Sequence, residues 1–80
     1  MTVWKFPFRL DDSIVLEMPE GAEILMVDCQ QGQPCMWARV NPDAPKKNYI
    51  FFLCGTGHPA PSGDHVASFQ QGPFVWHVFK

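Results

Sequence analysis

The chain has 80 residues, of which 46% are hydrophobic, and it contains seven Phe, three Trp and one Tyr. This length predicts a single domain over residues 1–80, and aromatic side chains, which bury about 150–250 Å² each, can supply much of its core. The formal net charge is −2, and no basic cluster larger than Lys46–Lys47 occurs. This argues against binding to a nucleic-acid backbone, which needs several cations on one face.

The three cysteines are Cys29, Cys35 and Cys54, and they form no Cys-x-x-Cys pair. No signal-peptide pattern follows Met1–Lys5, and no run approaches the roughly 20 apolar residues that a membrane helix requires. We therefore expect no membrane association and a cytoplasmic protein with reduced thiols. A bridge between Cys29 and Cys35 across a hairpin is compatible with their spacing, but a reducing compartment disfavours it.

The N-terminal region alternates between apolar and charged residues. Segment Val3–Leu10 places Trp4, Phe6, Phe8 and Leu10 on one face, which predicts a half-buried strand. Pro7 lies inside it, so this strand should lie at a sheet edge or contain a break. A turn at Asp11–Ser13 leads to a second alternating strand, Ile14–Met18. We expect these two strands to pair as a hairpin.

The next two strands are predicted on either side of a glycine-containing turn. Segment Ile24–Cys29 is apolar on both faces except at Asp28, which predicts a central strand. The connection Gln30–Pro34 is short and contains a glycine, so it favours a β-hairpin with the following strand, Cys35–Val40.

The C-terminal half begins with the most apolar run of the chain, Tyr49–Cys54, which predicts a buried strand. An irregular segment of roughly ten residues follows, a length that is often functional in compact domains. Two further strands are predicted, at His65–Phe69 and Phe74–Phe79. Helical periodicity is absent, so the sequence predicts an all-β fold, a small antiparallel sandwich or partly open barrel of about 6–7 short strands.

The candidate ligand-binding residues are Gly55, Thr56, Gly57 and His58, directly after the apolar run. Backbone N–H groups around glycines can form a concave nest that binds a small anion, and the Thr56 and His58 side chains can add donors. Gly-x-Gly alone is a weak signal, and the longer phosphate-binding motifs are absent. The alternative is a structural glycine corner in which His58 bonds to the backbone.

Catalytic and metal-binding interpretations use the same region. Cys54 and His58 are four residues apart. They could act as a nucleophile and its base only if the two glycines between them fold the chain back. His58, His65 and His77 lack the close spacing typical of zinc ligands. We therefore expect no catalytic residue, metal ligand or cofactor. A small metal- or thiol-dependent hydrolase remains the alternative.

The candidate interface residues are Trp76, His77 and Phe79 in the last predicted strand. Alternation directs His77 and Trp76 to opposite faces, so His77 shares its face with Val75 and Phe79. A partly apolar patch of this kind often marks an interface. Small chains also recruit partners when their own core is thin, so we expect a homo-oligomer.

Five segments resemble an uncharacterised family of short proteins encoded by bacteriophages, prophages and bacteria: Val3-Trp4-Lys5-Phe6, Met18-Pro19-Glu20-Gly21-Ala22-Glu23-Ile24-Leu25, Pro34-Cys35-Met36-Trp37-Ala38, Gly55-Thr56-Gly57-His58-Pro59 and Phe74-Val75-Trp76-His77-Val78-Phe79. The resemblance implies a phage or bacterial origin and a setting in the host cytoplasm. It supplies no activity and no functional residue.

By analogy with small phage proteins that lack catalytic motifs, we expect a noncatalytic binding protein that acts on host defence. It would bind a host protein or sequester a small anionic, nucleotide-like signal. A structural or virion-associated module is a further alternative.

Overall fold

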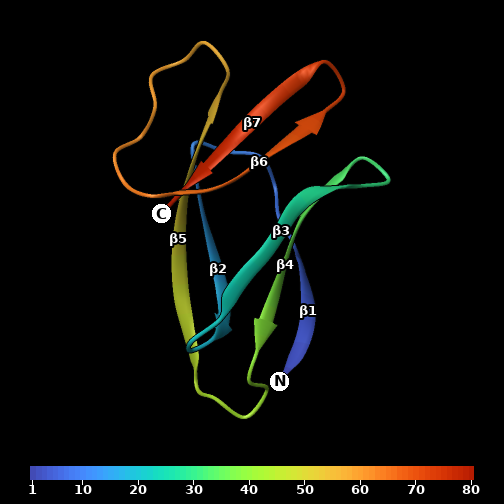
Figure 1. The fold of residues 1–80 in the computed structure, drawn as a ribbon, viewed down its shortest axis with the longest axis vertical. Coiled ribbons are helices and arrows are strands. Elements are labelled where there is room, and N and C mark those ends of the chain that lie inside the picture. Colours follow the sequence, from blue (N-terminus) through green and yellow to red (C-terminus); the bar gives the residue numbers. More distant parts are fainter.

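The computed structural model describes all 80 residues and contains seven β-strands without a helix (Figure 1). The prediction of an all-β fold is confirmed, as is the number of strands. Two antiparallel sheets form an open sandwich that does not close into a barrel, with strand orders β1-β4-β3 and β2-β5-β7-β6. The strands are β1 Thr2–Pro7, β2 Ser13–Pro19, β3 Glu23–Gln30, β4 Gln33–Val40, β5 Lys46–Gly55, β6 His65–Gln71 and β7 Phe74–Phe79.

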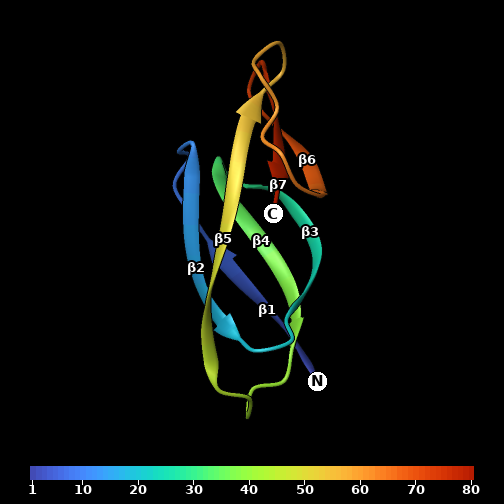
Figure 2. The same cartoon turned by 90° about the vertical axis from the view of Figure 1, so that its left-hand side faces the viewer.

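The core lies between the two sheets, whose strands cross at an angle (Figure 2). Each sheet contributes alternate residues of its strands, as period-2 alternation requires. Burying each large apolar side chain here contributes about 1.5–3 kcal/mol of transfer free energy. The buried cluster contains Phe8, Ile14, Met18, Val27, Met36, Ala38, Val40, Phe51, Leu53, Phe69 and Val78. No helix is long and apolar enough to cross a membrane.

The predicted hairpin between the first two strands is wrong. β1 pairs with β4, and β2 pairs with β5 in the other sheet. Between them the chain crosses from one sheet to the other: the Phe8 amide donates to the Pro34 carbonyl, and the Asp12 carbonyl accepts from the Leu53 amide. Phe8 is buried at this crossing and packs edge-on against Phe69 of β6. Alternation identifies a strand but not its partner, so this long-range packing decides the topology.

The prediction that Ile24–Cys29 is a central strand is also wrong, because β3 is an edge of the three-stranded sheet. A register shift between Ile24 and Met26 marks a β-bulge in this strand. A bulge adds a residue to one strand and redirects the neighbouring side chains. Leu25 and Met26 are accordingly exposed. The strand is therefore apolar along its length although only one of its faces is buried.

Segment Tyr49–Cys54 lies in β5, which is a strand but is not buried on both faces. Phe51 and Leu53 face the core, whereas Ile50 and Phe52 are exposed. β5 lies between two other strands of its sheet. The sandwich has only two layers, however, so no further layer covers the outer face of this sheet.

Two predictions about β1 and the central hairpin are confirmed. β1 is an edge strand, as Pro7 required. β3 and β4 form the expected hairpin, whose turn residues Gln31 and Gly32 both have positive φ, as a type I′ turn needs.

The Cys29–Cys35 bridge does not form. Cys35 lies opposite Asp28 in the β3–β4 ladder, and Cys29 lies opposite Pro34. Their side chains therefore point to opposite faces of the sheet. All three thiols are free, and burial together with the nearby Asp28 carboxylate and Cys35 raises the pKa of Cys29.

The register of β5 gives a direct stability test. Phe51 is 1% exposed and Phe52 is 41% exposed. We expect Phe51→Ala to lower the free energy of unfolding by about 3–5 kcal/mol, because it leaves a core cavity. Phe52→Ala is the matched control and should cost about 1 kcal/mol or less. Urea unfolding followed by circular dichroism measures both, and equal costs would show that the register is wrong.

Candidate functional site

The four predicted ligand-binding residues form a tight turn at the end of β5. The His58 amide donates to the Gly55 carbonyl at 3.1 Å, which closes a four-residue turn. Gly57 occupies the third position with a φ of 93°, the value that a type II turn requires there and that other residues rarely adopt. The turn also joins β7, because the Thr56 amide donates to the Val75 carbonyl at 3.1 Å.

These hydrogen bonds engage two of the amides on which the anion nest depended. A nest binds an anion through N–H groups that have no other acceptor. The N–H groups of Thr56 and His58 each donate to a backbone carbonyl, so neither is free to cradle a ligand. The segment has the backbone form of the glycine corner of the alternative interpretation. In it the His58 backbone, rather than its ring, makes the hydrogen bond.

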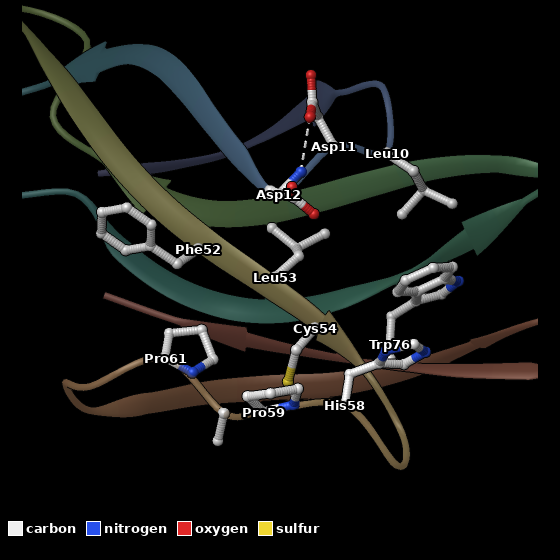
Figure 3. A pocket seen from close by; sticks show the side chains of 12 residues that line it. Leu10, Asp11, Asp12, Phe52, Leu53, Cys54, His58, Pro59, Pro61 and Trp76 are labelled. Carbon is white, nitrogen blue, oxygen red and sulfur yellow. Dashed lines mark hydrogen bonds between the residues drawn. The ribbon is translucent and has the colours of Figure 1, made fainter.

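Two aromatic rings lie close to Gly55. A Cβ atom at this position would lie 3.4 Å from His58 Cδ2 and 3.4 Å from Trp76 Cζ3. At that separation a β-carbon would make van der Waals contact with both rings. His58 folds back beside Trp76, as Figure 3 shows.

A cleft of about 610 Å³ opens at this end of β5 (Figure 3). Its walls are the crossing segment at residues 10–12, the end of β5 at residues 52–55, the loop at residues 58–61, and Trp76. Apolar groups predominate on the loop side, where Pro59 and Pro61 lie. Of the four residues predicted to bind a ligand, Gly55 and His58 line this cleft, whereas Thr56 and Gly57 do not.

The charges in the cleft are negative. Asp11 and Asp12 both line it, and no lysine or arginine does. The Asp11 carboxylate accepts a hydrogen bond from the Asp12 amide at 2.7 Å, which fixes the bend of the crossing segment. A carboxylate repels an anion and attracts a cation, so the walls are complementary to a neutral or positively charged ligand.

The cleft contains a thiol but no activated nucleophile. Cys54 lines the wall, and its sulfur points toward Pro59 (Figure 3). His58 lies in the same cleft, yet no hydrogen bond joins its ring to the Cys54 thiol. A thiolate nucleophile needs a base or cation in contact with it. The chain also contains no group of three His, Cys, Asp or Glu side chains that could hold a metal ion.

Four polar side chains form a hydrogen-bonded array on the outer face of the four-stranded sheet. Ser68 Oγ lies 2.9 Å from His65 Nε2 and 2.7 Å from His77 Nδ1. The second nitrogen of His77, Nε2, lies 2.8 Å from Thr56 Oγ1. The Thr56 hydroxyl donates to the Val75 carbonyl at 3.3 Å. The array therefore links the turn after β5 to β7 and β6.

With neutral imidazoles, one assignment of protons satisfies every contact of this array. Because the Thr56 hydroxyl donates to a carbonyl, its oxygen accepts from His77 Nε2–H. A neutral imidazole has one donor and one acceptor nitrogen, so His77 Nδ1 accepts from the Ser68 hydroxyl. The Ser68 oxygen then accepts from His65 Nε2–H. In this assignment each residue donates to the next along the array, from His65 through Ser68 and His77 to Thr56. Each of the two hydroxyl groups both donates and accepts a hydrogen bond.

Sequence reasoning missed Ser68 and grouped His65 with His77 only as conceivable metal ligands. Ser68 lies directly opposite His77 in the β6–β7 ladder, so a correct register would have found this pair. The contact from His65 depends on a bulge between His65 and Ala67, which the sequence does not reveal. His65 also packs edge-on against Phe79, with ring centroids 5.5 Å apart.

The three predicted interface residues divide between two faces. His77 and Phe79 lie on the outer face with the array. Trp76 lies opposite Phe69 and Gly55 and faces the inside of the sandwich and the cleft. Trp76 Nε1 is buried without a hydrogen-bond partner. Trp76 is thus a wall of the cleft and does not share a surface with the other two.

A family model for a domain of unknown function, DUF7352, matches residues 1–80. The chain belongs to this family. Searches of curated proteins and of solved structures found no match. Membership of a family without an established activity agrees with the sequence-based expectation.

The array predicts the tautomer of His77. At alkaline pH, where imidazoles are neutral, we expect the Nε2–H form to predominate, because Thr56 accepts there and Ser68 donates to Nδ1. Long-range ¹H–¹⁵N spectra distinguish the two tautomers. Thr56→Val and Ser68→Ala should each bring His77 closer to an equal mixture. His58, whose ring makes no hydrogen bond, is the internal control. A predominant Nδ1–H form would contradict the array.

Proposed function

We propose that this DUF7352 domain is a noncatalytic binding module that holds a protein partner at the cleft beside the end of β5. The observation that carries the proposal is the cleft itself, a cavity of about 610 Å³ with aromatic and proline walls. Ligand sites typically enclose about 300–1,000 Å³ and combine apolar walls with a few polar groups. Trp76, Phe52 and two prolines supply the apolar walls, and two aspartates and His58 supply the polar groups.

Of the two kinds of ligand expected from the sequence, the geometry favours a protein over a small anionic signal. The amides of Thr56 and His58 are engaged within the turn, and the cleft contains two carboxylates without a lysine or arginine. A nucleotide-like anion would meet negative charge there and no compensating cation.

The absence of an assembled nucleophile and base supports a noncatalytic role. Cys54 and His58 share the cleft without a hydrogen bond between them. Ser68 and His77 do make the contact of a nucleophile with a base, but Ser68 is exposed on the outer face and outside the cleft. An acyl-transfer site needs a pocket beside its nucleophile to hold the substrate.

The biological setting is a part of the same proposal. The resemblance to short phage, prophage and bacterial proteins supports a partner from the bacterial host, and we propose that the protein acts on host defence through this partner. Three unpaired thiols fit the reducing cytoplasm of that cell.

We also propose that the chain self-associates through the outer face of its four-stranded sheet. Val15 and Ile50 lie opposite each other on neighbouring strands and are 58% and 54% exposed. His77 and Phe79 lie on the same face of this sheet. Exposed apolar patches of this kind often become interfaces. Light scattering of the purified chain measures the association, and a monomer at all concentrations would contradict it.

A bulky side chain placed in the cleft tests whether the partner binds there. Ala60 lines the cleft on an exposed loop, whereas Ser62 lies two residues further on and does not line it. In affinity capture from bacterial lysate, we expect the unmodified chain and Ser62→Trp to retain the same protein in stoichiometric amount. Ala60→Trp should reduce the captured amount about tenfold, which corresponds to roughly 1.4 kcal/mol of binding free energy.

Two outcomes would contradict the proposal. If Ala60→Trp captures as much partner as Ser62→Trp, the cleft is not the binding surface. If calorimetry with cyclic and linear nucleotides shows saturable binding that Ala60→Trp abolishes, the ligand is a small anion and the protein partner is wrong.

A further inference from the structure

We infer that the occupant of the cleft is an extended segment of the partner that adds as a strand to the free edge of β5 and places an arginine or lysine between Asp11, Asp12 and Trp76. This inference rests on the proposed function and specifies the chemistry of the partner. It follows from the backbone at the end of β5 and from the charge of the walls.

β5 extends beyond the strand that covers one of its edges. The ladder between β2 and β5 begins where Ser13 lies opposite Phe52. β5 continues to Gly55, and on its other edge it pairs with β7 over residues 52–55. Beyond Phe52 this edge makes two backbone hydrogen bonds: the Leu53 amide donates to the Asp12 carbonyl at 2.9 Å, and the Gly55 carbonyl accepts from the His58 amide at 3.1 Å. Between these two hydrogen bonds the edge borders the cleft.

The pairing pattern shows which groups on this edge are free. In an antiparallel ladder, hydrogen-bonded pairs alternate with non-hydrogen-bonded pairs. The Thr56 amide bonds to the Val75 carbonyl, so the neighbouring pair, Gly55 and Trp76, is non-hydrogen-bonded. The Gly55 amide thus points away from β7. The Leu53 carbonyl also points away from β7. The Asp12 amide lies on that side of β5, but it donates to the Asp11 carboxylate and not to the Leu53 carbonyl.

One free donor and one free acceptor, two residues apart on a strand edge, match the backbone of an added strand. Extended peptides bind exposed sheet edges in this way, with backbone hydrogen bonds for affinity and pockets for alternate side chains. A helix has no free backbone groups in its middle to offer these two positions, so the geometry favours an extended segment.

The negative charge of the cleft walls favours a positively charged side chain in the cleft. Asp11 and Asp12 lie on one side of the cleft opening and provide two carboxylates, whereas no cation lines it. A guanidinium or ammonium group entering there would pair with the carboxylates and could lie against the Trp76 indole, an arrangement that attracts cations. Pro59 and Pro61 can pack on the aliphatic stem of the same side chain.

Three acetylated and amidated pentapeptides of alternating threonine and valine test the inference, with arginine, citrulline or glutamate at the centre. Citrulline keeps the shape of arginine and removes its charge. We expect the arginine peptide to bind at least roughly tenfold more tightly than the citrulline peptide, and the glutamate peptide not to bind. In ¹H–¹⁵N spectra of the folded chain, binding should shift the Gly55 amide and the Trp76 indole.

Charge-neutral variants test the walls. Asp11→Asn and Asp12→Asn should each weaken binding of the arginine peptide by roughly threefold to tenfold and leave the weak citrulline binding unchanged. Glu17→Gln is the matched control, because Glu17 is an exposed carboxylate on β2 outside the cleft. Methylating the central backbone nitrogens of the arginine peptide should abolish binding if the peptide adds as a strand.

Equal binding of the arginine and citrulline peptides, unchanged affinity in both aspartate variants, or no binding of any peptide would overturn the inference. A binding site that leaves the Gly55 amide unshifted would overturn it as well. These outcomes do not decide the proposed function, which fails only if filling the cleft with Ala60→Trp leaves partner capture intact.

Discussion

The burial of Phe51 and Leu53 in β5 is the constraint on which the rest of the structure depends. These side chains fix the register of β5 against the opposing sheet, and the register determines that Gly55 lies under the Trp76 and His58 rings. It also decides that β5 continues past the start of β2, because Phe52 is the last residue with a partner there. The core thus positions the open strand end, and the cleft is a consequence of that position.

Local patterns in the sequence predicted the strands but not how they pair. The hairpin around Gly32 was predictable because its turn chemistry is local, and the edge position of β1 followed from Pro7. The separation of β1 and β2 into different sheets depends on contacts such as Phe8 with Phe69, which are 61 residues apart in the chain. Apolar runs in β3 and β5 suggested burial on both faces. A two-layer sandwich, however, has no third layer to provide it.

The candidate site shows the same division. The glycines after β5 predicted a tight turn, and Gly57 indeed adopts the backbone angle that only glycine readily takes. Whether the amides of that turn were free depended on β7, since Val75 supplies the acceptor for Thr56. The array of His65, Ser68 and His77 depended on the register and on a bulge in β6. The pairing of β5 with β7 and the register and bulge of β6 are not encoded in a local pattern. The sequence therefore indicated where the site lies but not its chemistry.

The edge of β5 beyond Phe52 leaves the Leu53 carbonyl and the Gly55 amide unpaired, and it borders the proposed binding cleft. Amide hydrogen exchange in the unliganded protein tests this at three positions, Leu53, Gly55 and Thr56. Leu53 and Thr56 donate to the Asp12 and Val75 carbonyls, so their amides should be protected. The Gly55 amide should exchange orders of magnitude faster, close to the rate of an unprotected amide. Protection of Gly55 equal to that of Thr56 would show that the edge is already paired and would contradict the account.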